Sequence, residues 1–197
     1  MLENLIHRKK RFEGLKLHLY YDSQNVLSGL YGHNFEHNHI PDSIIKKHGT
    51  RWIEKPPYSE EIASDFLHED TVHSLKNVMN IFGKAKFGFN EADLRMGNTE
   101  ALDSEFPYEV LTVLDDLMFN LGYYRFIKFK RFIHFIKAGD YYLASRELKW
   151  KDGSKQDEYT LYYSQIEDIV NSLEAQGISN TFHRAEENIA LLLKACK

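Results

Sequence analysis

Hydrophobic residues recur along the chain with two spacings, which predict one small sheet near the N-terminus and helices elsewhere. The first twelve residues carry apolar side chains at helical spacing, and this pattern stops at Glu13-Gly14. Apolar and polar residues then alternate from Leu15 to Tyr20, which is typical of a strand. A turn cluster at 22–25 precedes a second extended run that begins at Val26-Leu27. The beginning of the chain therefore predicts a short helix followed by a small antiparallel sheet.

The middle of the chain predicts one long helix between two irregular stretches. Residues 37–58 are polar and contain three prolines, so we expect a loop there. Ser59-Glu60-Glu61 is a typical helix start, and the apolar stripe after it predicts a helix of about six turns. Residues 83–103 have weak periodicity and three glycines, which indicates a loop or an irregular helical stretch.

Helical patterns dominate from Pro107 onward. The first stripe ends at Gly122 and the next at Gly139, where Asp140 is placed to cap a helix over 141–149. A further helix is expected at about 160–176, and Thr181 can cap the last one. The fold class predicted is α+β, with a small sheet lobe followed by a larger helical lobe.

Composition and charge narrow the classes of function. The net charge is -4 with both signs interspersed, which gives no basic face for nucleic acid. The basic run His7–Arg11 lies in a predicted helix. We interpret it first as a solvent-exposed face of that helix and second as a contact for a polyanion. Cys196 is the single cysteine, so no intrachain disulfide can form. Neither a membrane span nor a signal peptide is visible, so we expect synthesis in a cytoplasm and no stable membrane association.

Two carboxylates near the N-terminus are candidates for catalysis. Glu13 lies at a helix end and Asp22 in a strand turn, so the two can flank a cleft. Glycoside hydrolysis needs such a pair, an acid for the leaving oxygen and a base or nucleophile opposite. The hydroxyl of Ser28 could orient water. Spacing alone does not distinguish this arrangement from two surface acids.

The stretch Glu13–His33 resembles the signature of phage-type lysozymes, which are endolysins of glycoside hydrolase family 24. The family pattern is E-G-L-x-L-x-x-Y-x-D, then a threonine five intervening residues later, then glycines and a G-H pair. The matching residues here are Glu13, Gly14, Leu15, Leu17, Tyr20, Asp22, Gly32 and His33. The family's threonine is Ser28, which keeps the hydroxyl. The glycine that precedes the G-H pair in the family is shifted to Gly29.

Three later segments are also similar to the family. Phe119-Asn120-Leu121-Gly122 matches an aromatic-Asn/Gln-x-Gly step, and Gly139-Asp140-Tyr141 matches a G-D-Y/W segment. Arg184 lies in an N-R-A-like step whose arginine is near the catalytic glutamate in the family. The segment between Trp150 and Asn180 is longer than in the family and accounts for the added helix.

The resemblance implies a lysozyme-like two-lobed fold with the active site between the lobes. The expected parts are a helix and β lobe at 1–58, a connecting helix at 59–82 and a helical lobe at 83–197. The implied reaction is hydrolysis of the β-1,4 bond between N-acetylmuramic acid and N-acetylglucosamine of peptidoglycan, with inversion. We expect a monomer that needs no cofactor or metal, released to the cell wall by a holin.

The resemblance also implies roles for individual residues. Glu13 would be the general acid, while Asp22 with Ser28 would hold or activate water. The supporting residues implied are His33, Tyr20, Asn120 and Arg184. Beside Glu13, Arg184 would favour the ionised acid, so we expect it to organise the cleft floor or to form a salt bridge that packs the last helix onto the first.

Three alternatives remain open. The chain could be a catalytically weak lysozyme fold used as a binding or scaffolding module, or a virion-associated lysozyme that opens the wall during infection. His33-Asn34-Phe35-Glu36-His37 also spells the zinc-peptidase pattern H-x-x-E-H, which requires a helix. Gly32 before the pattern and Pro41 after it indicate strand and loop instead, with His39 adding at most incidental metal binding.

Overall fold

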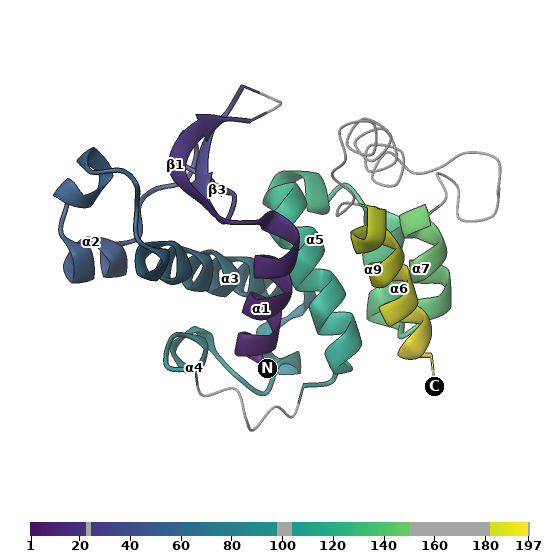
Figure 1. Ribbon diagram of the computed structural model, residues 1–197. Coiled ribbons are helices and arrows are strands. Elements are labelled where there is room, and N and C mark those ends of the chain that lie inside the picture. The colour runs from purple at the N-terminus through teal and green to yellow at the C-terminus, as the bar shows by residue number, and fades with distance from the viewer. Residues whose placement is uncertain (23–24, 98–103, 150–181, 197) are drawn as a thin grey trace. The chain divides into compact units, whose positions relative to one another are not determined.

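The computed structural model describes residues 1–22, 25–97, 104–149 and 182–196. The fold is α+β, as the sequence predicts: helices dominate, and one small antiparallel sheet lies near the N-terminus (Figure 1). The chain divides into two compact units, of which the first comprises 1–76 and 89–101 and the second 77–88 and 102–197. The three-part division expected from the resemblance stays a prediction, and each unit is described by itself below.

The first unit begins with helix α1 (Leu2–Glu13), which ends where the apolar pattern stops. Leu2 and Leu5 are buried on its apolar side. Gly14 follows with φ 65°, in the left-handed region that suits glycine because it has no Cβ. The chain therefore changes direction directly after Glu13 and enters the sheet.

The sheet has three antiparallel strands in the order β1-β2-β3. The strands are β1 (Lys16–Tyr21), β2 (Leu27–Leu30) and β3 (His33–Asn34). Tyr20 of β1 lies opposite Ser28 of β2, which in turn lies opposite Asn34 of β3. The side chains of Ser28 and Leu30 are buried, so the middle strand contributes most to the core.

Strand β1 lies at an edge of this sheet. Its register against β2 is irregular between Lys16 and Tyr20, which is the mark of a bulge. The backbone N–H of Tyr58 donates a hydrogen bond to the carbonyl of Leu17, at 2.8 Å. A segment from outside the sheet therefore supplies a hydrogen-bond donor to one backbone carbonyl of β1.

The loop predicted for 37–58 is wrong in part, because it contains helix α2 (Asp42–His48) and the 3₁₀ helix η1 (Arg51–Glu54). Pro41 precedes α2 and Asp42 lies in its first turn, where an acidic group is favoured. Gly49 ends it with φ 75°. Ile44 is its buried residue, so the helix is too short to show an apolar period.

The long helix α3 (Glu60–Phe82) forms where the apolar stripe predicts one. Its buried Phe66 is the centre of an aromatic cluster in the first unit. The ring of Trp52 lies 5.2 Å from that of Phe66, and the ring of Phe35 lies 5.6 Å from it. Tyr58 completes the cluster at 5.3 Å from Trp52. These rings attach η1 and the turn after β3 to α3, since offset and edge-to-face aromatic pairs are favourable.

A short helix follows in the stretch predicted to be irregular. Helix α4 (Glu91–Arg95) begins with a capping box, in which Asn90 accepts from the N–H of Asp93 and the Asp93 carboxylate accepts from the N–H of Asn90. This reciprocal cap satisfies backbone donors that a five-residue helix otherwise exposes.

The described part of the second unit consists of helices and one isolated β-bridge, between Phe87 and Ser104. Its described elements are η2 (Lys84–Lys86), α5 (Tyr108–Phe126), α6 (Lys130–Ala138), α7 (Tyr141–Lys149) and α9 (Phe182–Lys194). Helix α5 is buried from Val110 to Met118, and α9 packs against α5 and α7. The expected break at Gly122 is present as a non-helical residue with φ 68°, after which the chain resumes a helical turn.

The junction of α6 and α7 has the caps that the sequence predicts. Gly139 adopts the left-handed conformation, and Asp140 accepts the N–H of Leu143 at 3.0 Å. The helix expected at about 160–176 and the cap expected from Thr181 lie outside the described residues.

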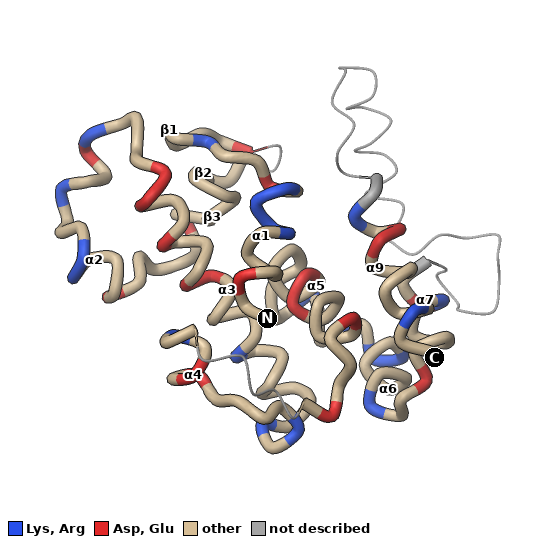
Figure 2. The backbone as a smooth tube through the Cα atoms, turned by 60° about the horizontal axis from the view of Figure 1, so that its bottom comes forward, with Lys and Arg blue, Asp and Glu red and all other residues tan. Residues whose placement is uncertain are grey.

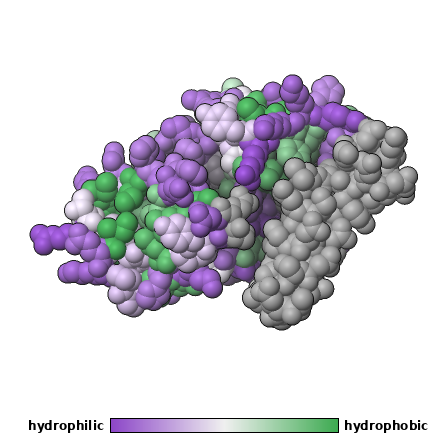
Figure 3. All heavy atoms as spheres, turned by 90° about the horizontal axis from the view of Figure 1, so that it is seen from above, coloured by the Kyte–Doolittle hydropathy of each residue, from purple (hydrophilic) through white to green (hydrophobic). Residues whose placement is uncertain are grey.

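The surface is of mixed polarity. Figure 3 shows hydrophobic areas bordered by hydrophilic side chains on the face that it presents. Tyr21, Met96 and Tyr124 are the most exposed large apolar residues of the described part. None of the helices in that part combines the length and the apolar character that crossing a membrane requires.

Candidate functional site

The carboxyl group of Glu13 lies against the turn that follows β2. Glu13 is the last residue of α1 and is half-buried. Its Oε2 lies 3.1 Å from the position that a Cβ would take on Gly32, whose φ is 81°. A side chain at position 32 would therefore meet both a strained backbone and the Glu13 carboxyl. The glycine of the G-H pair thus makes room for the candidate acid.

Asp22 lies at the end of β1 and is half-buried. Its Oδ1 accepts the backbone N–H of Val26 at 2.9 Å, and its own N–H donates to the carbonyl of Val26 at 3.0 Å. Because the turn holds one carboxylate oxygen, the position of the whole side chain is fixed relative to β2.

Tyr20 lies on β1, two residues before Asp22. Burial raises the pKa of its phenol, and the negative charges of Glu13 and Asp22 raise it further. The phenol stays protonated at neutral pH and can donate a hydrogen bond.

Ser28 lies directly opposite Tyr20 across the strands, and its side chain is buried. The four residues that the sequence selected on α1 and the β1–β2 hairpin therefore lie on adjoining elements of one unit. They are Glu13, Tyr20, Asp22 and Ser28.

His33 anchors the sheet to α3. Its side chain is 1% exposed, and its Nδ1 lies 2.9 Å from Oδ2 of Asp70. The imidazole also lies edge-on to Phe35 and Phe66, with both ring centroids at 4.7 Å. His33 thus holds β3 against α3. Asp70 was not selected from the sequence, and its separation of 37 residues from His33 leaves no local signal.

The zinc-peptidase reading of His33–His37 is wrong. The pattern needs a helix that presents both histidines to one metal, whereas β3 and a turn occupy this segment. His37 and His39 are exposed. In the described part of the chain, the one group of histidine and carboxylate side chains close enough to share a metal is His48, Glu61 and Asp65.

Asn120 and Arg184 belong to the second unit. Asn120 is exposed, and its Nδ2 donates to the backbone carbonyl of Asp116 at 2.6 Å. Arg184 is buried, and its Nε and Nη2 each lie 2.9 Å from Oδ1 of Asp116. Asn188 donates to the other carboxylate oxygen at 2.8 Å. This salt bridge joins the last helix to α5, while the packing of the last helix onto the first stays a prediction.

No protein-family model and no curated protein matches this sequence.

Proposed function

We propose that this chain is a glycoside hydrolase of the lysozyme type with a lysozyme-like two-lobed fold. Its substrate would be the β-1,4 bond between N-acetylmuramic acid and N-acetylglucosamine in peptidoglycan. The observation that carries the proposal is that the Glu13 carboxyl lies against Gly32, in the turn that follows the strand of Ser28, while Asp22 follows the neighbouring strand β1. Two carboxyl groups on different elements are the minimum machinery of glycoside hydrolysis.

In the proposed reaction, Glu13 is the general acid that protonates the leaving oxygen. Asp22 acts as the base that takes a proton from water on the opposite face of the sugar, which inverts the anomeric centre. The turn fixes one oxygen of Asp22, and the other is the one proposed to face the water. Ser28 orients that water, and Tyr20 donates a hydrogen bond near both acids. No cofactor takes part.

The proposal is tested by measuring reducing ends released from purified peptidoglycan. The wild-type chain is compared with Glu13→Gln, which keeps the size and hydrogen-bonding capacity of the side chain but cannot supply the proton. We expect the variant to lose a factor of about 10²–10⁴ in rate, the usual contribution of a general acid. A folded wild type that releases no reducing ends from several wall types would refute the proposal and favour the binding or scaffolding module.

Asp22→Asn separates catalysis from structure at the second acid. Asparagine keeps the oxygen that accepts the N–H of Val26, so the turn and the melting temperature should be preserved. The negative charge and the basicity are lost, so the rate should fall by a factor of about 10²–10⁴. A variant as active as the wild type would show that Asp22 only closes the turn.

A further inference from the structure

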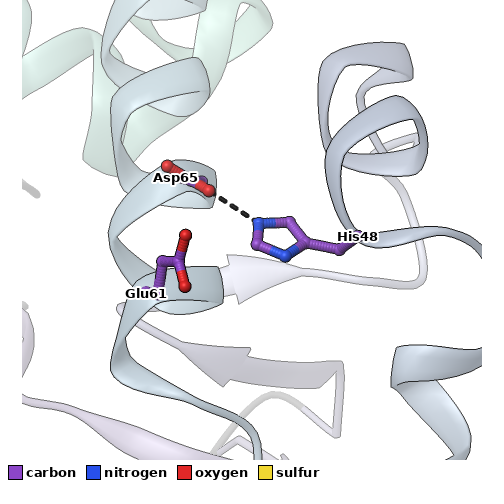
Figure 4. Close-up of side chains that lie close together, drawn as sticks. All are labelled: His48, Glu61 and Asp65. Carbon is purple, nitrogen blue, oxygen red and sulfur yellow. Dashed lines mark hydrogen bonds and ion pairs between the residues drawn. The ribbon is translucent and has the colours of Figure 1, made fainter.

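Three side chains that can bind metals lie together in the first unit, on elements that carry none of the proposed catalytic residues. They are His48 from the end of α2, and Glu61 and Asp65 from the first turns of α3 (Figure 4). One ligand atom from each lies within 4.8 Å of the other two. Figure 2 shows the acidic positions of α3 in red and the lysines of α2 in blue.

The positions of the three residues on α2 and α3 bring their side chains together. Glu61 and Asp65 are four residues apart, so they share one face of α3. Gly49 ends α2 directly after His48, and Nε2 of that histidine lies 2.6 Å from Oδ2 of Asp65. In Figure 4 the imidazole of His48 points at Asp65, with Glu61 one turn away on the same side.

A cation already lies between the two carboxylates. The ammonium of Lys47 is 2.7 Å from Oδ2 of Asp65 and 3.0 Å from Oε1 of Glu61. The Lys47 side chain is 51% exposed and that of Glu61 is 66% exposed, so both can rearrange at little cost. The ammonium can move into water, and its place between the carboxylates suits a metal cation.

We propose that His48, Glu61 and Asp65 bind one Zn²⁺ ion, which displaces the Lys47 ammonium and keeps a water as its fourth ligand. An imidazole combined with two carboxylates suits zinc, whereas calcium and magnesium prefer oxygen ligands alone. Ligands about 2.0–2.2 Å from a tetrahedral zinc stand about 3.3–3.6 Å apart. His48 Nε2 and Asp65 Oδ2 are 2.6 Å apart and would have to separate by about 1 Å at most, while the exposed Glu61 side chain can rotate to adjust its own distance to both.

The proposed ion would fasten the C-terminal end of α2 to α3 and so stabilise the first unit. A ligand that binds only the folded state raises the free energy of unfolding in proportion to the logarithm of its concentration. This role is independent of the proposed glycosidase activity, because Glu13 and Asp22 take no part in the site.

The test is a zinc titration of metal-stripped protein, followed by isothermal calorimetry and by the melting temperature. We expect one zinc per chain with a Kd in the micromolar range and a rise in melting temperature. His48→Gln should weaken binding by about tenfold or more, as loss of an imidazole ligand requires. Lys47→Met should tighten binding, because the competing ammonium is gone, and this variant keeps all three ligands.

The matched control is the double variant His37→Gln/His39→Gln, which removes two exposed histidines outside the site. Zinc binding that survives in this control and is lost in folded His48→Gln supports the proposal. Three results would overturn it: no binding by the wild type at millimolar zinc, loss of binding in the control, or weaker binding by Lys47→Met.

Discussion

The buried ion pair between Arg184 and Asp116 allows a structural role of Arg184 to be tested separately from a role in the reaction. The side chains are 7% and 2% exposed, so the pair is almost fully removed from water. Arg184→Met keeps much of the length of the side chain but removes the charge that faces Asp116. Removing one partner of a buried ion pair costs about 3–5 kcal/mol, because the other charge stays in the interior. In a chain of this size each kcal/mol lowers the melting temperature by about 2–4 °C, so the expected fall is about 6–20 °C.

The assay is thermal unfolding followed by circular dichroism at neutral pH, with Lys194→Met as the matched control. Lys194 also joins α9 to α5, through an ion pair of 2.6 Å with Glu109, but its side chain is 63% exposed. Exposed pairs contribute about 0–1 kcal/mol, so this control should melt close to the wild type.

A double variant isolates the charge itself. Asp116→Asn combined with Arg184→Met removes both charges of this pair and keeps an oxygen that accepts the amide of Asn188. We expect it to recover most of the stability that the single variant loses. If Arg184→Met melts within about 2 °C of the wild type but releases no reducing ends from peptidoglycan, the structural role is wrong.

Three further variants test individual features. Gly32→Ala should destabilise the chain by about 1–3 kcal/mol and reduce any activity, because the new Cβ strains the backbone and meets the Glu13 carboxyl; an unchanged melting temperature would contradict this. Asp140→Ala removes the cap of α7 and should cost about 1 kcal/mol in denaturant unfolding; a loss close to zero would show that the cap is dispensable. Burial of Asp65 opposes its ionisation, yet hydrogen bonds from two side chains of α2 lower its pKa. The metal-free wild type should therefore melt about 2–4 °C above Asp65→Asn near pH 6, and this difference should shrink as the pH falls below the usual aspartate range near 4 and through the lowered pKa of Asp65; a difference that stays constant or grows as the pH falls would contradict it.

The features that the sequence predicted well are those with local signals. Gly14 and the Gly139-Asp140 pair mark helix ends by their own backbone and side-chain chemistry. Alternation over β1 and the long apolar stripe of α3 each extend over enough residues for a period to be recognised. Helix α2 was missed because seven residues with one buried apolar side chain do not establish a period.

The residues of the candidate site likewise include some that the sequence identified and others that only the structure revealed. Glu13, Tyr20 and Asp22 were selected because they lie close together in the sequence and match one motif. The partners of His33 and Arg184 are 37 and 68 residues away, and only the packing of helices brings Asp70 and Asp116 to them. No spacing rule reaches across such separations, so these buried pairs required the structure.

The irregular edge strand β1 bears on how the protein behaves at high concentration. An open strand edge is a template on which strands of other molecules can assemble into aggregates. Here the bulge between Lys16 and Tyr20 twists the edge, and the Tyr58 N–H already occupies the carbonyl of Leu17. Lysine at the start of the strand adds a charge that a second strand would have to bury. The same hairpin that carries the proposed catalytic residues is thereby a poor seed for intermolecular β-sheet.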